Sequence, residues 1–139
     1  MNLTRILPLA LSLALLAGCS GGDKPALSAE ARTQLYETAI EDARDAETND
    51  ALPVLSDKAD EQLPLYLDLM GLTPDDVDAF ALSASLMNVR AYGIAAVYPA
   101  QGRETAVREG LEGFIDRQKQ SFEQYLADQY DIASNARLE

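Results

Sequence analysis

The feature that most constrains the fold is a change in hydrophobic period near residue 100. From residue 80 to residue 87 apolar side chains alternate with smaller ones, which is the period of a β-strand. From residue 104 they recur in steps of three and four, which is the period of an amphipathic helix. The helical stripe comprises Val107, Leu111, Phe114, Gln118, Phe122 and Tyr125. Such a chain is expected to pack a long helix on a small sheet.

Residues 91–98 predict a second strand, after a turn at residues 88–90. This strand is apolar on both faces, so it requires cover on both sides. Before the strands, residues 29–46 predict a helix with Ser28 as its N-cap. Residues 63–70 predict a second helix, with Gly71 just after its end. The predicted fold is α+β: a small antiparallel β-sheet packed against a long C-terminal amphipathic helix over residues 104–129, preceded by N-terminal helices.

The N-terminus has the pattern of an export signal. Arg5 is followed by an apolar run at residues 6–17, interrupted only by Ser12. This run has 12 residues, whereas a helix needs about 20 to span a bilayer, so it predicts a cleaved signal peptide. A lipobox typical of bacterial lipoproteins follows directly, composed of Leu16, Ala17, Gly18 and Cys19.

The lipobox predicts cleavage between Gly18 and Cys19. The thiol of Cys19 then carries a diacylglyceryl group, with or without a third acyl chain such as palmitate on the new amino group. Two acyl chains suffice for stable membrane anchoring. The predicted organisation is a signal peptide at residues 1–18, a lipidated cysteine and flexible tether at residues 19–27, and one small α+β domain at residues 28–139. No other cofactor is predicted.

Composition excludes several kinds of chemistry. The formal net charge is -12, and it becomes -13 without residues 1–18, whose only charged side chain is Arg5. This balance disfavours nucleic-acid binding. The chain has no histidine and one cysteine, which lipidation consumes. Cys/His zinc sites, Ser-His-Asp and Cys-His triads and histidine bases are therefore excluded.

The acidic clusters give no site either. Asp45, Glu47 and Asn49 fit the start of a calcium-binding EF-hand loop, but Asp50 and Ser56 stand where glycine and glutamate are required. Asp75, Asp76 and Asp78 form another cluster, and acids at a helix start explain the first two. We predict no catalytic and no metal-binding residue.

Two further patterns are interpreted as packing. Gly110 and Gly113 are expected to allow close contact between the long helix and the sheet. Tyr36, Tyr92 and Tyr125 are placed on core faces by their periodicity.

The second half of the chain resembles an uncharacterised family of lipoproteins common in Gram-positive gut anaerobes, known as a domain of unknown function. The resemblance covers residues 69–138 and rests on MGLTPDDV at 70–77, YGIA at 92–95 and DRQKQSFEQY at 116–125. The family continues after the long helix into strands that pair with the first hairpin. Here the sequence stops near Ala136, so we expect either a truncated sequence or a two-stranded sheet. An open edge of such a sheet invites pairing.

These observations predict a lipid-anchored extracytoplasmic protein that does not act as an enzyme. The leading hypothesis is a binding or interaction module at the cell envelope, with a protein partner there. The alternative is an accessory subunit of a transporter or envelope assembly, and a hydrolase using carboxylates and a metal is less favoured. The resemblance implies the outer face of a Gram-positive cytoplasmic membrane. Ser20 after the lipidated cysteine is also compatible with an outer membrane facing the periplasm.

Overall fold

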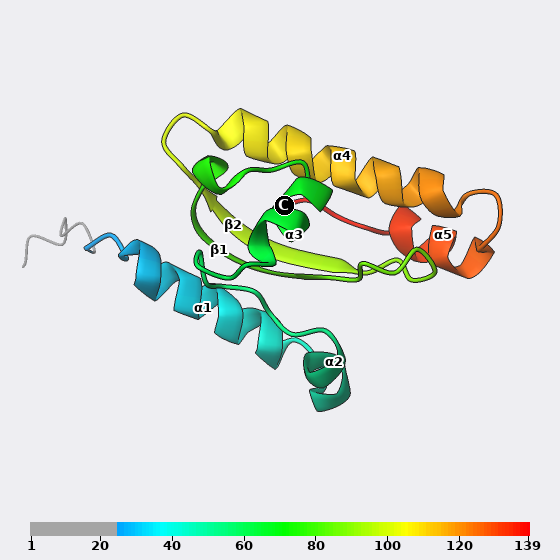
Figure 1. The fold of residues 1–139 in the computed structure, drawn as a ribbon, viewed down its shortest axis with the longest axis horizontal. Helices are drawn as coiled ribbons and strands as arrows, with labels where there is room; N and C mark the ends of the chain where they lie inside the picture. The colour runs from blue at the N-terminus through cyan, green and yellow to red at the C-terminus, as the bar shows by residue number, and fades with distance from the viewer. Residues whose placement is uncertain (1–24) are drawn as a thin grey trace, which may run out of the picture.

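A computed structural model describes residues 25–139 of the chain (Figure 1). The predicted lipobox residues, Leu16 to Cys19, lie outside this part. The elements in order are α1 (Ala29–Asp42), α2 (Ala46–Ala51), α3 (Leu63–Leu69), the short 3-10 helix η1 (Pro74–Asp76), β1 (Val77–Ala84), β2 (Gly93–Pro99), α4 (Glu104–Phe122) and α5 (Ala127–Ser134). The predicted α+β class is confirmed. Among the helices of residues 25–139, none is long and apolar enough to span a membrane.

The sheet consists of β1 and β2, which pair antiparallel, and it lies between α1 and α4 (Figure 1). Phe80 and Leu82 of β1 pack with Val107 and Phe114 of α4 in the main hydrophobic cluster. The alternate side chains of β1 face α1, where the Ser83 hydroxyl accepts a hydrogen bond from a side chain just beyond that helix. β1 is therefore covered on both faces, whereas β2, for which cover on both faces was expected, is only half-buried.

The two edges of the sheet differ. On the outer side of β1, the Leu55 N–H donates to the Leu82 carbonyl at 2.8 Å, and the Leu82 N–H donates back to Leu55 at 2.9 Å. The outer side of β2 has no hydrogen-bonded strand or bridge within residues 25–139. One edge is thus closed locally, and the other is open.

The first predicted helix begins as expected but ends earlier. The Ser28 hydroxyl accepts a hydrogen bond from the Ala31 N–H at 3.2 Å, which confirms the N-cap. The helix ends at Asp42 rather than at residue 46. Asp45 instead caps α2 by accepting from the Thr48 N–H at 2.7 Å, and this hydrogen bond lowers the pKa of Asp45. The last residue of the predicted helix, Ala46, therefore starts a new short helix.

The predicted strand boundaries are also shifted. The first strand begins at Val77 and ends at Ala84, and the second begins at Gly93. Leu86 and Met87, which continue the alternating pattern, lie in the connecting loop and are 50% and 58% exposed. The alternating pattern predicted too late an end for the first strand, because apolar side chains in an exposed loop can alternate without belonging to a strand.

The predicted helix over residues 104–129 is divided into two. Its first part, α4, has 19 residues, or about 28 Å at the usual rise. The chain then turns, and α5 packs back so that Ala133 and Leu126 join Phe122 in a second cluster. Tyr125, expected in the core, lies in the turn and is 60% exposed.

Candidate functional site

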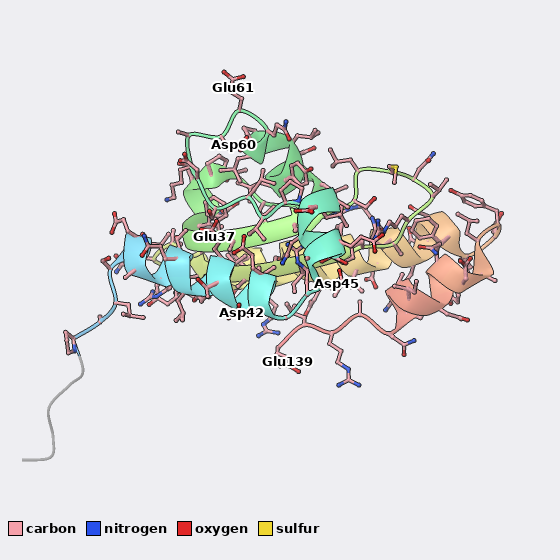
Figure 2. The ribbon with its side chains drawn as sticks, turned by 90° about the horizontal axis from the view of Figure 1, so that it is seen from below. Glu37, Asp42, Asp45, Asp60, Glu61 and Glu139 are labelled. Carbon is pink, nitrogen blue, oxygen red and sulfur yellow. The ribbon has the colours of Figure 1, made fainter. Side chains whose placement is uncertain are left out.

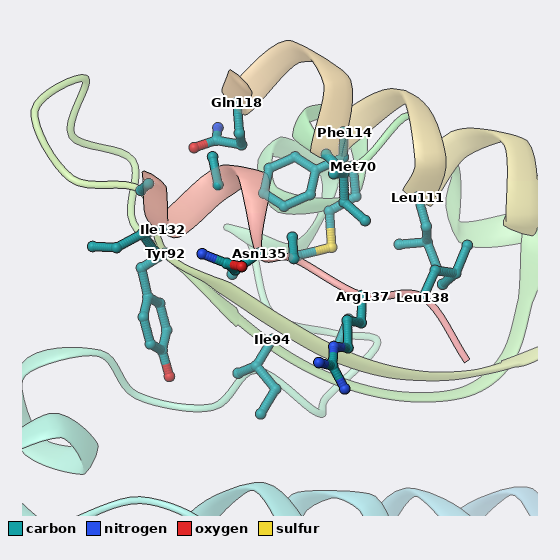
Figure 3. Close-up of a pocket in the computed structure, with 16 residues that line it drawn as sticks. Met70, Tyr92, Ile94, Leu111, Phe114, Gln118, Ile132, Asn135, Arg137 and Leu138 are labelled. Atoms are coloured by element: carbon teal, nitrogen blue, oxygen red, sulfur yellow. The ribbon is translucent and has the colours of Figure 1, made fainter. Parts of the chain in front are cut away.

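An apolar groove with a volume of about 300 Å³ lies between β2 and α4 (Figure 3). Its roof is formed by Leu111, Phe114 and Ile115 of α4, and Met70 closes it from the side of α3. Figure 3 shows Leu111 and Phe114 pointing from the helix toward the strand. This groove, which we call the β2 groove, is open to solvent along the free edge of the sheet.

Small residues on β2 create the β2 groove. A Cβ atom on Gly93 would lie 2.7 Å from the Phe114 ring, so α4 can approach this end of the strand only because the residue is glycine. Two positions further along, Ala95 has a side chain too short to fill the space beneath the helix, and it lines the groove. A bulky side chain at either position would close the groove or push α4 away.

The main chain at the edge of β2 has hydrogen-bonding capacity that the protein does not use. The Ser85 N–H donates to the Tyr92 carbonyl at 3.0 Å, so the main chain of Tyr92 points toward β1. In an antiparallel pair this direction alternates, and Gly93, Ala95 and Val97 therefore point their N–H and carbonyl groups away from β1. Within residues 25–139, no hydrogen bond from another segment reaches these three residues.

The C-terminal residues lie in the β2 groove without completing the sheet. Ala136, Arg137 and Leu138 line the groove, and the chain passes between β2 and α4 (Figures 1 and 3). Its only main-chain hydrogen bond in this stretch is local, from the Ala136 N–H to Ala133 at 3.2 Å. The segment therefore covers part of the groove through side chains alone.

The lining of the β2 groove suits apolar binding better than catalysis. Arg137 is its only charged residue, and Gln118 and Asn135 add polar groups. Pockets for small organic ligands occupy about 300 to 1,000 Å³ and enclose most of the ligand. An open groove at the lower end of this range is suited to a few side chains of a larger partner.

The apolar residues of α1 are divided between a buried and an exposed side. Ile40 is buried against the sheet, whereas Leu35, Ala39 and Ala43 are exposed, Leu35 by 54%. Arg32 of the same helix stacks on the Tyr98 ring of β2 at 3.5 Å from its centroid.

The acidic clusters are dispersed or engaged in structure. Figure 2 shows Asp60 and Glu61 on the opposite side of the molecule from Glu139. Asp76 accepts from the N–H and hydroxyl of Thr73 and from Arg103, so both of its oxygens are occupied. Within residues 25–139 no three acidic or thiol side chains gather in a way that could hold a metal ion.

A half-buried arginine is the other unusual polar feature. The Arg44 guanidinium donates to Asn49, to the Leu52 carbonyl and to the hydroxyls of Ser83 and Tyr92, at 2.8 to 3.1 Å. Its Nη2 atom is buried without a hydrogen-bond partner among residues 25–139. Because Arg44 does not line the β2 groove, we assign it the role of joining α1 and α2 to the sheet.

Sequence reasoning did not find the β2 groove. The local signal was the pair of small residues Gly93 and Ala95, which stand on the same face of an apolar strand. Gly110 was interpreted as a contact between helix and sheet, but it faces the turn after α3, where an added Cβ would lie 2.7 Å from the Gly71 oxygen. The β2 groove and the contact of Gly110 both depend on packing between residues that are far apart in the sequence.

The fold and the groove define a small α+β protein with one open sheet edge beside an apolar hollow. The chain belongs to the family described as a domain of unknown function (DUF4358), whose sequence profile matches residues 65–139, just over half of the chain. This confirms the predicted membership of an uncharacterised family. The matched segment contains every residue that lines the β2 groove. No curated relative and no solved structure matches the chain.

Proposed function

We propose that this protein is a lipid-anchored module that binds a partner outside the cytoplasm through the β2 groove. The observation that carries the proposal is the coincidence of an apolar groove with an open sheet edge at Gly93, Ala95 and Val97. The N-terminal pattern ending in Cys19 supports the location. The absence of histidine from the sequence and the engagement of Asp76 by Thr73 and Arg103 favour binding over hydrolysis.

A second candidate is an accessory subunit of a transporter or other envelope assembly. The open edge of β2 favours it, because a two-stranded sheet is marginally stable alone and gains from an added strand. This candidate differs from the first in its partner, which would be a permanent neighbour in the membrane. Both use the same surface of the molecule.

Site-specific photocrosslinking in intact cells tests the proposal. A crosslinking amino acid at Ile115, inside the β2 groove, is expected to give a discrete adduct larger than the monomer. The matched control is Gln120, which is exposed on the same helix and does not line the groove. Adduct at Ile115 alone supports the proposal. Monomer only at Ile115, or equal adducts at both positions, contradicts it.

A further inference from the structure

We infer that the connection between β1 and β2, residues 85–92, is a second membrane contact, whose apolar side chains enter the surface of a lipid bilayer. We call this connection the β1–β2 loop. The inference goes beyond the proposed function and rests on one part of it, the lipid anchor at Cys19. The bilayer would then orient the domain as well as hold it.

The β1–β2 loop carries a group of exposed apolar side chains. Leu86, Met87 and Val89 are exposed by 50%, 58% and 55%. Leu65 of α3 lines the same hollow as Leu86 and Met87, and Tyr125 is hydrogen-bonded to the loop. These five are among the nine large apolar side chains that are exposed in the described part of the chain. Such a gathering is typical of a surface that meets a membrane or a protein.

The β1–β2 loop is held in place by the region that follows α4. The Tyr125 hydroxyl donates to the Asn88 carbonyl at 2.7 Å. The Ala91 N–H donates to the Gln129 side chain of α5 at 2.8 Å. Figure 1 shows the loop extending past the strands toward α5. The fold therefore supports the loop with its apolar side chains in solvent.

The local charge of this surface differs from that of the whole molecule. The sequence has 23 acidic residues, yet none lies between Asp78 and Glu104, a stretch that includes the entire loop. Arg90 is the one charged residue of the loop, and Asp68 is the one charged residue that lines the hollow beside it. An apolar surface with few charges suits the boundary between headgroups and acyl chains.

Two amphipathic side chains of this surface are of the kind found at membrane interfaces. Tyr125 is 60% exposed, and Arg90 is exposed with its guanidinium 5.7 Å from the centre of the Tyr92 ring. Tyrosine is enriched where membrane meets water, and arginine can bury its stem while its charge stays in water. Both residues can therefore border the inserted side chains.

The predicted anchor makes a bilayer the partner that is always within reach. Residues 19–27 are predicted to join the lipid to the domain, and a chain of this length spans about 30 Å at most. Tethering gives the loop a high effective concentration at the bilayer, so a contact of a few side chains suffices. A protein partner would have to be met by diffusion.

Fluorescence quenching on the mature acylated protein in phosphatidylcholine vesicles tests the inference. Because acylation consumes the Cys19 thiol, Met87→Cys introduces the only free thiol for an environment-sensitive fluorophore. The matched control is Leu35→Cys on α1, because Leu35 is 54% exposed against 58% for Met87. A fraction of the lipid carries a nitroxide quencher on an acyl chain.

We expect the fluorophore at position 87 to be quenched and to emit at shorter wavelength, while the fluorophore at position 35 shows neither change. Val89→Glu in the protein labelled at position 87 should abolish the quenching, because a carboxylate opposes entry into an apolar medium. Leu35→Glu should leave the quenching unchanged. Val89 and Leu35 are exposed by 55% and 54%, so both variants are expected to fold.

Three results would overturn the inference. The first is absence of quenching at position 87, and the second is equal quenching at both labelled positions. The third is quenching that Val89→Glu does not reduce. A discrete protein adduct from a photocrosslinking amino acid at Met87 in intact cells would identify a protein as the partner and also overturn it.

The outcomes separate this inference from the proposed function. If position 87 is not quenched while Ile115 crosslinks in cells, the β2 groove remains the binding site and only the membrane contact is wrong. If position 87 is quenched while Ile115 gives no adduct, the membrane contact stands and the function of the groove is wrong. An unmodified Cys19 thiol in the native protein would remove the anchor and overturn both.

Discussion

At the scale of single residues, Asp76 shows how a suspected site residue serves the fold. Its side chain is 6% exposed, and its Oδ1 accepts from the Arg103 Nε at 2.7 Å. Its Oδ2 accepts from the Thr73 N–H and hydroxyl, each at 2.8 Å. The Thr73 N–H, and then Arg103, hold the pKa of Asp76 below its usual value of 3.8. The carboxylate thus fixes the start of β1 to the start of α4.

Asp76→Asn should lower the free energy of unfolding at about pH 7 by about 2 kcal/mol, because charge-assisted hydrogen bonds to a buried group are lost. The folded-state pKa of Asp76 is depressed. Its contribution is therefore complete above the unfolded value and is lost as pH falls below 3.8 toward the folded value. The difference in the free energy of unfolding between the unmodified protein and Asp76→Asn should therefore narrow as the pH falls below 3.8. Urea unfolding at about pH 7 and about pH 3 measures it. An equal difference at both values would contradict this account.

At the scale of elements, the two glycines of α4 have different roles. A Cβ on Gly110 would lie 2.7 Å from the Gly71 oxygen and 2.8 Å from a methyl group of Leu72. A Cβ on Gly113 would meet only the mobile end of Arg117, at 3.1 Å. Only Gly110 is therefore required for α4 to lie against the turn that follows α3.

Alanine substitutions at these positions should change stability in opposite directions. Gly113→Ala should stabilise by about 0.5 to 1 kcal/mol, the usual gain within a helix. Gly110→Ala should destabilise by about 1 to 3 kcal/mol, because crowding of backbone atoms outweighs that gain. Thermal and urea unfolding of the two variants measure the effects. Stabilisation by both would show that α4 does not approach the turn this closely.

Features of the fold that depend on neighbouring residues were predicted correctly, whereas features that depend on contacts between distant segments were not. The Ser28 cap and the left-handed turn at Gly71, with φ 72°, were predictable because they depend on neighbouring residues. The end of α4 at Phe122 was not predictable, because no glycine or proline marks it. Beyond Phe122 the chain turns so that α5 packs on this residue, which is a contact between segments that periodicity does not show. Strand boundaries were missed for a similar reason, since pairing rather than alternation ends β1 at Ala84.

At the scale of the whole molecule, the binding surface arises from parts that are distant in sequence. The β2 groove joins Met70, β2, α4 and Leu138. Periodicity assigns each of these apolar side chains to a core but cannot show that one edge of that core is left open. Sequence alone therefore predicted the fold class and the family but not the candidate site.

The N-terminal pattern supports a location at a membrane surface, and the β2 groove supports binding of a partner there. Acyl chains on Cys19 would hold the molecule at a membrane surface, while an acidic exterior keeps the domain in water. A binding module of this kind acts on partners in the envelope. If the protein were never exported, the proposed partner would be in the wrong compartment.

The most direct test of that central claim is mass spectrometry of the N-terminal proteolytic peptide of the protein extracted from its own cells. We expect a peptide that begins at Cys19 and carries the mass of a diacylglyceryl group, with or without a third acyl chain. Cys19→Ala should leave the signal peptide uncut and abolish the added mass. A peptide that begins before Cys19, or one that begins there with an unmodified thiol, would contradict it.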